Sequence, residues 1–321
     1  MTLILTTFWH RGVSQIAHRQ LSREIGAKVT AFDLLSNKTI LFAARDAFVT
    51  MSYSGYGYIE GTPTDEWIVG ILRGRPMNRA ADGVRPSSIS LGRITPWPSI
   101  GIAVRTLAEE IEAAYKRLGR PARKRFYLGI ALAGWQVSRR QRPRVFALTI
   151  RKHDGLPSPK VDRVRRHLGR GGGIFDEPEG YMEPPELDAS VRGFIDGLKQ
   201  DPKTAEQAII DGLRTVAKRN RPKIGEDCMC VLIPPPHVGW ARVRFAPMAA
   251  HRGTLKHAKG RTDLPIAFSP WIVTQGMTMA PSIMVGGQSV DIGPWKLEIE
   301  APESDQGGIL SIISSQSRPR L

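Results

Sequence analysis

Thr2, directly behind the initiator methionine, is the residue of this sequence best suited to nucleophilic chemistry. Methionine aminopeptidases remove Met1 before small residues, which would make Thr2 the first residue of the mature chain. A free α-amino group has a pKa of about 8, so at neutral pH part of it is unprotonated and can accept the proton of the Thr2 hydroxyl. One residue would then supply both nucleophile and base. The alternative is an ordinary processed N-terminus.

The segments that follow Thr2 predict a rigid support for it. Residues 2–9 are rich in β-forming side chains and, with residues 13–17, predict a hairpin. Residues 38–42 and 47–53 predict a second hairpin, closed by a glycine-rich turn at 54–57. A strand that begins at Thr2 would hold the hydroxyl in a sheet rather than on a frayed tail.

Later segments alternate between helical and strand patterns. A helix is expected from Thr64 to the neighbourhood of Gly74, capped by Thr62 or Thr64. Further helices are expected at 99–118, 187–198 and 203–218, strands at 126–133, 144–150, 228–233, 241–245, 271–274 and 295–299, and loops at 75–98 and 152–186. This order favours an α+β fold in which antiparallel sheets are flanked by helices. We expect one domain at 1–245 and a partly irregular C-terminal extension at 246–321.

Together these motifs resemble the proteasome-like family of N-terminal-nucleophile (Ntn) hydrolases, above all the proteasome β-type and HslV-like peptidases. The resemblance rests on the Thr-led strand, on residues 36–40 and 54–57, and more loosely on residues 129–135. Residues 54–67 are also similar to uncharacterised bacterial proteins with a proteasome-like fold. The resemblance implies a four-layer αββα sandwich, hydrolysis of amide bonds without a cofactor, a peptide or protein substrate, and a homo-oligomer.

The resemblance also assigns site residues by motif position. Lys38 stands where the family has a lysine beside the nucleophile, and an ammonium there favours both the unprotonated amine and the developing alkoxide. His18 stands where the family has an aspartate; it could act as acid or base but cannot hold Lys38 by charge pairing. The alternatives are a solvent-facing strand lysine and a hydrogen-bonded histidine at a strand end.

Two further parts of the proposed site come from the same likeness. A backbone N–H of the Ser54–Gly55 turn would serve as the oxyanion donor, because glycine lets the main chain approach a substrate carbonyl. Asp227 and Cys230 resemble the family's Asp-x-x-Ser element, with cysteine where serine is usual. A tight turn, a loop acid and a buried thiol are the alternatives.

Charge suggests a different class of function. The net charge is +16, and residues 116–171 hold 17 Lys or Arg against only Asp154 and Asp162. Such a segment could attract nucleic acid or an acidic partner, or it could be a solvated basic surface. We therefore keep two alternatives to the hydrolase: a catalytically inactive scaffold or ring subunit, favoured by His18 and Cys230, and a nucleic-acid-binding protein.

Cysteine usage and hydropathy suggest a location. Cys228 and Cys230 are two residues apart on a predicted strand, a poor geometry for a mutual disulfide, and no spacing predicts a metal site. No apolar run reaches the roughly 20 residues that a membrane helix needs, and no basic region precedes the short apolar start. We expect a cytoplasmic protein with no membrane partner.

Overall fold

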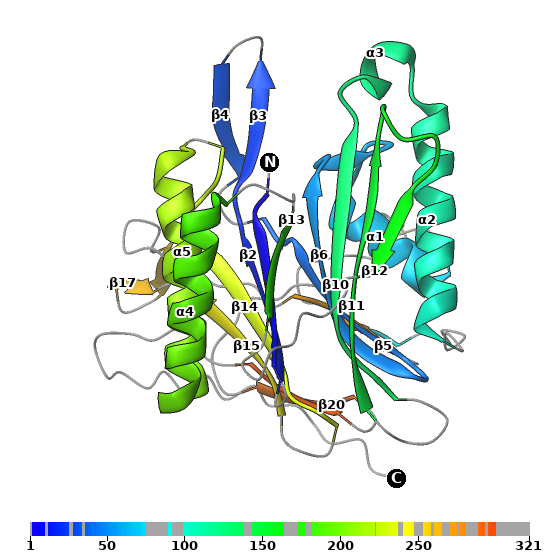
Figure 1. Ribbon diagram of the computed structural model, residues 1–321. Helices are drawn as coiled ribbons and strands as arrows, with labels where there is room; N and C mark the ends of the chain where they lie inside the picture. The colour runs from blue at the N-terminus through cyan, green and yellow to red at the C-terminus, as the bar shows by residue number, and fades with distance from the viewer. Residues whose placement is uncertain are drawn as a thin grey trace.

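Two large sheets lie face to face and are covered on their outer sides by helices (Figure 1). The computed structural model describes residues 2–9, 12–25, 28–33, 36–74, 89–91, 99–137, 143–163, 173–177, 182–221, 223–236, 240–246, 253–257, 260–264, 270–274, 277–279, 288–292 and 295–299. Much of the predicted loop at 75–98 lies outside these residues.

The first sheet has seven strands and contains the strand that follows Thr2. Its spatial order is β13 (Gly173–Glu177), β1 (Ile4–Trp9), β2 (Gly12–His18), β14 (Cys228–Ile233), β15 (Trp240–Ala246), β21 (Trp295–Ile299) and β20 (Gln288–Ile292). Neighbouring strands are antiparallel except β15 and β21.

The second sheet has eight strands and contains the strand that follows Lys38. Its spatial order is β12 (Lys160–Arg163), β11 (Pro143–His153), β10 (Tyr127–Val137), β6 (Ala47–Gly55), β5 (Thr39–Ala44), β18 (Trp271–Val273), β19 (Met277–Met279) and β9 (Ile89–Leu91). All pairs are antiparallel except β5 and β18.

Helices form the two outer layers. The second sheet is covered by α1 (Thr64–Arg73) and α2 (Ile100–Arg117), and the first by α4 (Pro184–Gln200) and α5 (Pro202–Arg219) (Figure 1). The remaining elements are the short α3 (Arg120–Arg123) and the small hairpins β3 (Leu21–Ile25) with β4 (Lys28–Asp33), β7 (Tyr58–Ile59) with β8 (Thr62–Pro63), and β16 (Gly253–His257) with β17 (Gly260–Leu264). The predicted four-layer αββα sandwich is confirmed.

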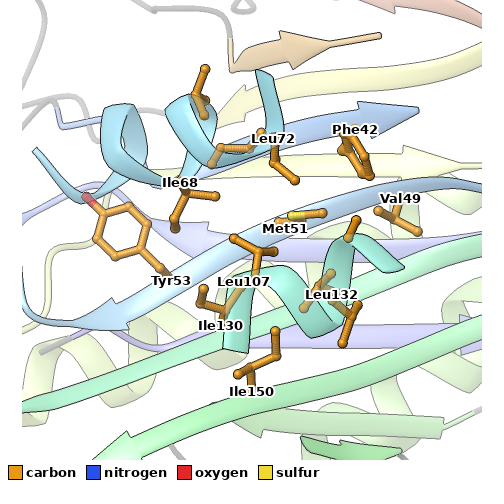
Figure 2. Packing of buried hydrophobic residues seen from close by; sticks show 14 of the residues in the cluster. Phe42, Val49, Met51, Tyr53, Ile68, Leu72, Leu107, Ile130, Leu132 and Ile150 are labelled. Carbon is orange, nitrogen blue, oxygen red and sulfur yellow. The ribbon is translucent and has the colours of Figure 1, made fainter. Parts of the chain in front are cut away.

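The apolar core follows from the period of two along each strand. Val49 and Met51 of β6 point outward, where Ile68 of α1 and Leu107 of α2 pack over them (Figure 2). The neighbouring residue Phe48 points to the opposite face of the strand and belongs to a separate cluster between the two sheets. Both faces of this strand are therefore buried, one against helices and one against the other sheet.

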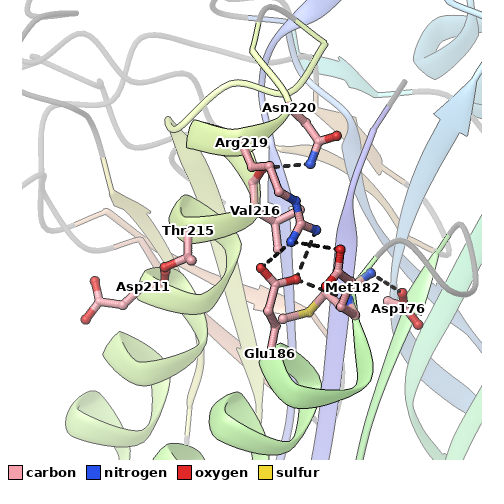
Figure 3. Close-up of polar contacts among 9 residues, drawn as sticks. Asp176, Met182, Glu186, Asp211, Thr215, Val216, Arg219 and Asn220 are labelled. Atoms are coloured by element: carbon pink, nitrogen blue, oxygen red, sulfur yellow. Dashed lines mark hydrogen bonds and ion pairs between the residues drawn. The ribbon is translucent and has the colours of Figure 1, made fainter.

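Polar contacts join α4 to α5 and to the first sheet (Figure 3). Arg219 near the end of α5 makes a two-pronged pair with Glu186 of α4, at 2.7 and 3.0 Å. The amide of Met182 donates to the Asp176 carboxylate of β13 at 3.1 Å. Because Asp176 precedes Glu177, this bond ties the end of β13 to the start of α4.

Among the described residues, no helix is long and apolar enough to span a membrane.

The structure also corrects several predictions of local structure. Neither Thr62 nor Thr64 caps α1: the N-cap is Pro63, and the Thr64 hydroxyl instead donates to the Tyr56 carbonyl oxygen at 2.7 Å. The predicted loops contain the strands β9, β12 and β13. These strands have three to five residues and lie among glycines, prolines and charged residues, so no alternation marks them.

Four strands from residues 246–321 belong to the large sheets: β18 and β19 to the second sheet, β20 and β21 to the first. β18 adds to β5 and β21 adds to β15. The Trp271 indole of β18 also donates to the Asp65 carboxylate at the start of α1, at 2.8 Å. The division of the chain at residue 245 stays a prediction.

We expect Asp65→Asn to stabilise the protein at pH 8 and not at pH 4. Burial raises the pKa of Asp65 from 3.8 to about 6, and the hydrogen bond from Trp271 offsets only part of this rise. Since the folded state binds the proton more tightly, stability falls as pH rises from about 4 to about 7, and an uncharged asparagine avoids this loss. Thermal unfolding across this pH range checks it.

The matched control is Asp188→Asn, which removes an exposed carboxylate near the start of α4. An Asp65→Asn protein no more stable than the wild type at pH 8, or equally stabilised at both pH values, would contradict the prediction.

Candidate active site

Thr2 and Lys38 meet across the two sheets. The Lys38 ammonium donates to the Thr2 hydroxyl with Nζ and Oγ1 2.8 Å apart, and also to the carbonyl oxygen of Gln20, which follows β2. Both side chains are 2% exposed. An ammonium beside a hydroxyl in a dry site favours the alkoxide, because Coulomb attraction is stronger where water is excluded.

The strand next to Lys38 fixes where its side chain starts. The Lys38 carbonyl oxygen accepts from the Tyr53 amide at 3.3 Å, so the lysine is tied to β6. One residue on, the hydroxyls of Thr39 and Ser52 lie 3.1 Å apart. Lys38 is therefore positioned by the sheet, and its burial excludes the alternative of a solvent-facing strand lysine.

All the predicted site residues lie at one end of the sandwich. The His18 amide donates to the Leu3 carbonyl oxygen at 3.4 Å, and His18 pairs with Cys228, the residue after Asp227. In the other sheet, the end of β6 lies near the start of β5 because the two strands are antiparallel. Figure 1 shows the N-terminus and the end of β6 at this same end.

Gly55 ends β6 in a conformation that needs glycine. Its φ is +97°, and a Cβ atom there would lie 2.0 Å from the Tyr127 carbonyl oxygen. That oxygen accepts from the Tyr56 amide at 2.8 Å, which continues the β6–β10 pairing one residue beyond Gly55. The predicted turn at 54–57 is a bend at Gly57, and the chain reverses only at Glu60 and Gly61, between β7 and β8. The oxyanion role of the Ser54–Gly55 amide stays a prediction.

His18 is buried with its ring bound to the loop before β14. Its Nδ1 accepts from the Gly225 amide at 3.3 Å, and the residue is 0% exposed. The preceding residue, Ala17, packs with Ile4 and Ala131 between the sheets. Strand alternation therefore places His18 on the helix-covered face, whereas Thr2 shares the inner face with Ile4. A part for His18 in proton transfer stays a prediction.

Asp227 and Cys230 are separated by the same alternation. Asp227 is buried at the start of β14, and its carbonyl oxygen accepts from the Arg19 amide at 2.9 Å. Cys230 packs in the cluster under α4 and α5, with its Sγ 3.3 Å from the Ser14 hydroxyl. Burial, and then the charge of Glu206, raises the pKa of the Cys230 thiol well above its usual value. Cys230 is thus the buried thiol that the sequence allowed as an alternative.

One charged group between the sheets was not predicted from the sequence. Glu177, the last residue of β13, is fully buried; its carboxylate accepts from the Tyr127 hydroxyl and pairs with Arg151 Nε at 2.7 Å. Glu177 is the antiparallel partner of Ile4, two residues from Thr2. The only signal for it was an acidic residue in a segment predicted to be a loop.

Acidic neighbours offset part of the predicted basic segment. Among its described residues, these make ion pairs: Lys116 and Lys152 with Glu112, Arg117 with Glu60, Arg151 with Glu177, and Lys160 with Asp162. Binding of nucleic acid or an acidic partner by residues 116–171 stays a prediction.

Comparison with known proteins gives similar folds at low identity. The sequence matches no protein-family model and no curated protein. A Gly-1 mutant of Anbu from Hyphomicrobium sp. strain MC1 is 10% identical, with 73% of this chain and 82% of that chain covered and a TM-score of 0.42. The Anbu complex of Pseudomonas aeruginosa, solved as a helical assembly, is 8% identical, with 77% and 87% covered and a TM-score of 0.45. Thiobacillus denitrificans BPH in complex with epoxomicin is 10% identical, with 72% and 98% covered and a TM-score of 0.37.

Proposed function

We propose that this chain is an Ntn-type amide-bond hydrolase, similar to threonine peptidases, whose nucleophile is Thr2 after removal of Met1. One observation carries the proposal: the buried Lys38 ammonium lies 2.8 Å from the Thr2 hydroxyl, across the two sheets. Burying a lysine is costly, and a lysine that only filled space could be replaced by an apolar residue. A site that must stabilise negative charge on Thr2 gives the ammonium a reason to be there.

The reaction would run through an ester on Thr2. The free α-amine takes the hydroxyl proton while Oγ1 attacks the amide carbonyl, and a backbone N–H of the Ser54–Gly55 turn stabilises the oxyanion. The amine returns its proton to the leaving nitrogen as the C–N bond breaks. Water, deprotonated by the same amine, then cleaves the ester and restores the hydroxyl. Asp227 and His18 complete the proposed site by their motif positions.

The substrate class and setting follow from the resemblance. We infer a peptide or protein substrate, a homo-oligomeric assembly and a cytoplasmic location. The free, buried thiols of Cys228 and Cys230 are compatible with a reducing compartment.

We expect Thr2→Ala to abolish labelling by an electrophilic β-lactone or epoxyketone probe, and Thr2→Ser to keep it. Alanine and serine both allow removal of Met1, but only serine retains a hydroxyl on the first residue. Intact mass spectrometry reports both the first residue and the added probe. Thr215→Ala, which removes an exposed hydroxyl of α5, is the control and should label like the wild type. Labelling that survives Thr2→Ala, or retention of Met1, would overturn the proposal.

A second variant tests the lysine. Lys38→Met keeps a long side chain at a buried position but removes the charge, so the fold should persist while acylation slows by about 100-fold, the scale of one electrostatic stabiliser. The measurement is the rate of probe labelling, with thermal unfolding to check the fold. Lys199→Met, at an exposed ion pair of α4, should leave the rate unchanged. A folded Lys38→Met protein that labels at the wild-type rate contradicts the assigned role.

One observation favours an inactive scaffold of the same fold as the second candidate. His18 is bound to the Gly225 amide on the helix-covered face, and Cys230 lies in the core under α4 and α5, so both side chains lie on the opposite face of the sheet from Ile4. A correctly processed protein with Thr2 first that no probe labels would select this candidate. Light scattering would then show whether it forms a ring or other assembly.

A further inference from the structure

The Glu177 side chain reaches from the first sheet to the second, near the end of the sandwich where Thr2 lies. It lies on β13 opposite Ile4, yet its side chain bonds to two residues of the other sheet, Tyr127 of β10 and Arg151 of β11. The carboxylate is fully buried, whereas the Arg151 side chain is 20% exposed. The two sheets are thus joined by a charged bridge as well as by apolar packing.

The second sheet is shaped to receive this carboxylate. Ser54, Gly129 and Arg151 are direct partners across β6, β10 and β11, so they share one face of the sheet. A Cβ atom on Gly129 would lie 2.1 Å from Glu177 Oε1 and 3.0 Å from the Ser54 hydroxyl oxygen. Only glycine at this position leaves room for the carboxylate beside Ser54.

Tyr127 connects the carboxylate to the turn that carries Gly55. Its hydroxyl donates to Glu177, while its carbonyl oxygen and ring pack against Gly55: a Cβ there would lie 2.0 Å from the oxygen and 2.6 Å from Cδ1. The Tyr127 carbonyl oxygen also accepts from the Tyr56 amide at 2.8 Å. Burial, and then the Glu177 charge, raises the pKa of Tyr127 well above its usual value, so its hydroxyl remains a donor. Tyr127 thereby contacts both Gly55 and Tyr56, next to the Ser54–Gly55 amide.

We propose that Tyr127, Glu177 and Arg151 form a brace that sets the position of the Ser54–Gly55 amide from which the oxyanion is stabilised. This inference rests on the proposed function. The three are positioning residues: Arg151 holds the carboxylate, the carboxylate holds the tyrosine hydroxyl, and the tyrosine holds the turn. Such donors act only when their N–H points at the place where charge develops, so a small displacement of the N–H weakens the stabilisation of the oxyanion.

The test separates probe binding from acylation. In Tyr127→Phe and Glu177→Gln we expect the maximal rate of β-lactone labelling to fall about tenfold, a fraction of the value of a whole oxyanion donor, while the half-saturating probe concentration stays the same. The acid midpoint of the pH–rate profile should not move, because the brace acts on the oxyanion and not on the amine. Hydrogen exchange of residues 54–57 should become faster in both variants.

Matched controls remove similar groups elsewhere. Tyr115→Phe loses a hydroxyl that donates to the Asp154 carboxylate, and Glu60→Gln breaks an exposed pair with Arg117; both should match the wild type. An unchanged maximal rate, a loss that appears entirely as a shifted pH midpoint, or unchanged exchange at residues 54–57 would each overturn the brace.

The same experiment distinguishes failure of the brace from failure of the proposed hydrolase. A wild-type protein that is not labelled, or a Thr2→Ala protein that is, contradicts the proposed hydrolase. Exchange at residues 54–57 then still decides whether Tyr127 and Glu177 hold the turn: faster exchange in both variants keeps the brace as a structural device, and unchanged exchange removes it.

Discussion

The contact between the Lys38 ammonium and the Thr2 hydroxyl constrains much of the fold. Packed sheets lie about 10 Å apart, so a lysine can span from one to the other only if both residues sit at the same end. That requires β1 and β5 to start at one edge, and it requires an acceptor for the second proton that Lys38 donates. The chain supplies this acceptor as the Gln20 carbonyl oxygen, just beyond the end of β2.

The helical period of 3.6 residues and the alternation along strands were sufficient to predict most of the long helices and strands. α2 and the hairpins β1–β2 and β5–β6 have enough residues for their apolar periodicity to be visible, and the structure confirms them. β12 and β13 were missed because they have four and five residues, and such short strands take their stability from neighbours rather than from their own pattern. The edge position of β13 beside β1 is a tertiary property.

The site was predictable to the extent that it depends on local motifs. Lys38 and Gly55 lie at the ends of predicted strands, and the family resemblance assigned both to the site. Glu177 could not, because its partners Arg151 and Tyr127 are 26 and 50 residues away in sequence and meet it only when the sheets stack. The orientation of His18 was partly accessible: counting alternate residues from Ile4 and its partner Ala17 puts His18 on the other face.

The addition of β18 to β5 has a consequence for the order of synthesis. Until Val273 has left the ribosome, the strand that leads on from Lys38 has an open edge, and its pairing must wait for residues far along the chain. The hairpin β5–β6 can form early, since its contacts are local. The surroundings of Lys38 are therefore completed late, which delays the finished site until nearly all of the described chain has been made.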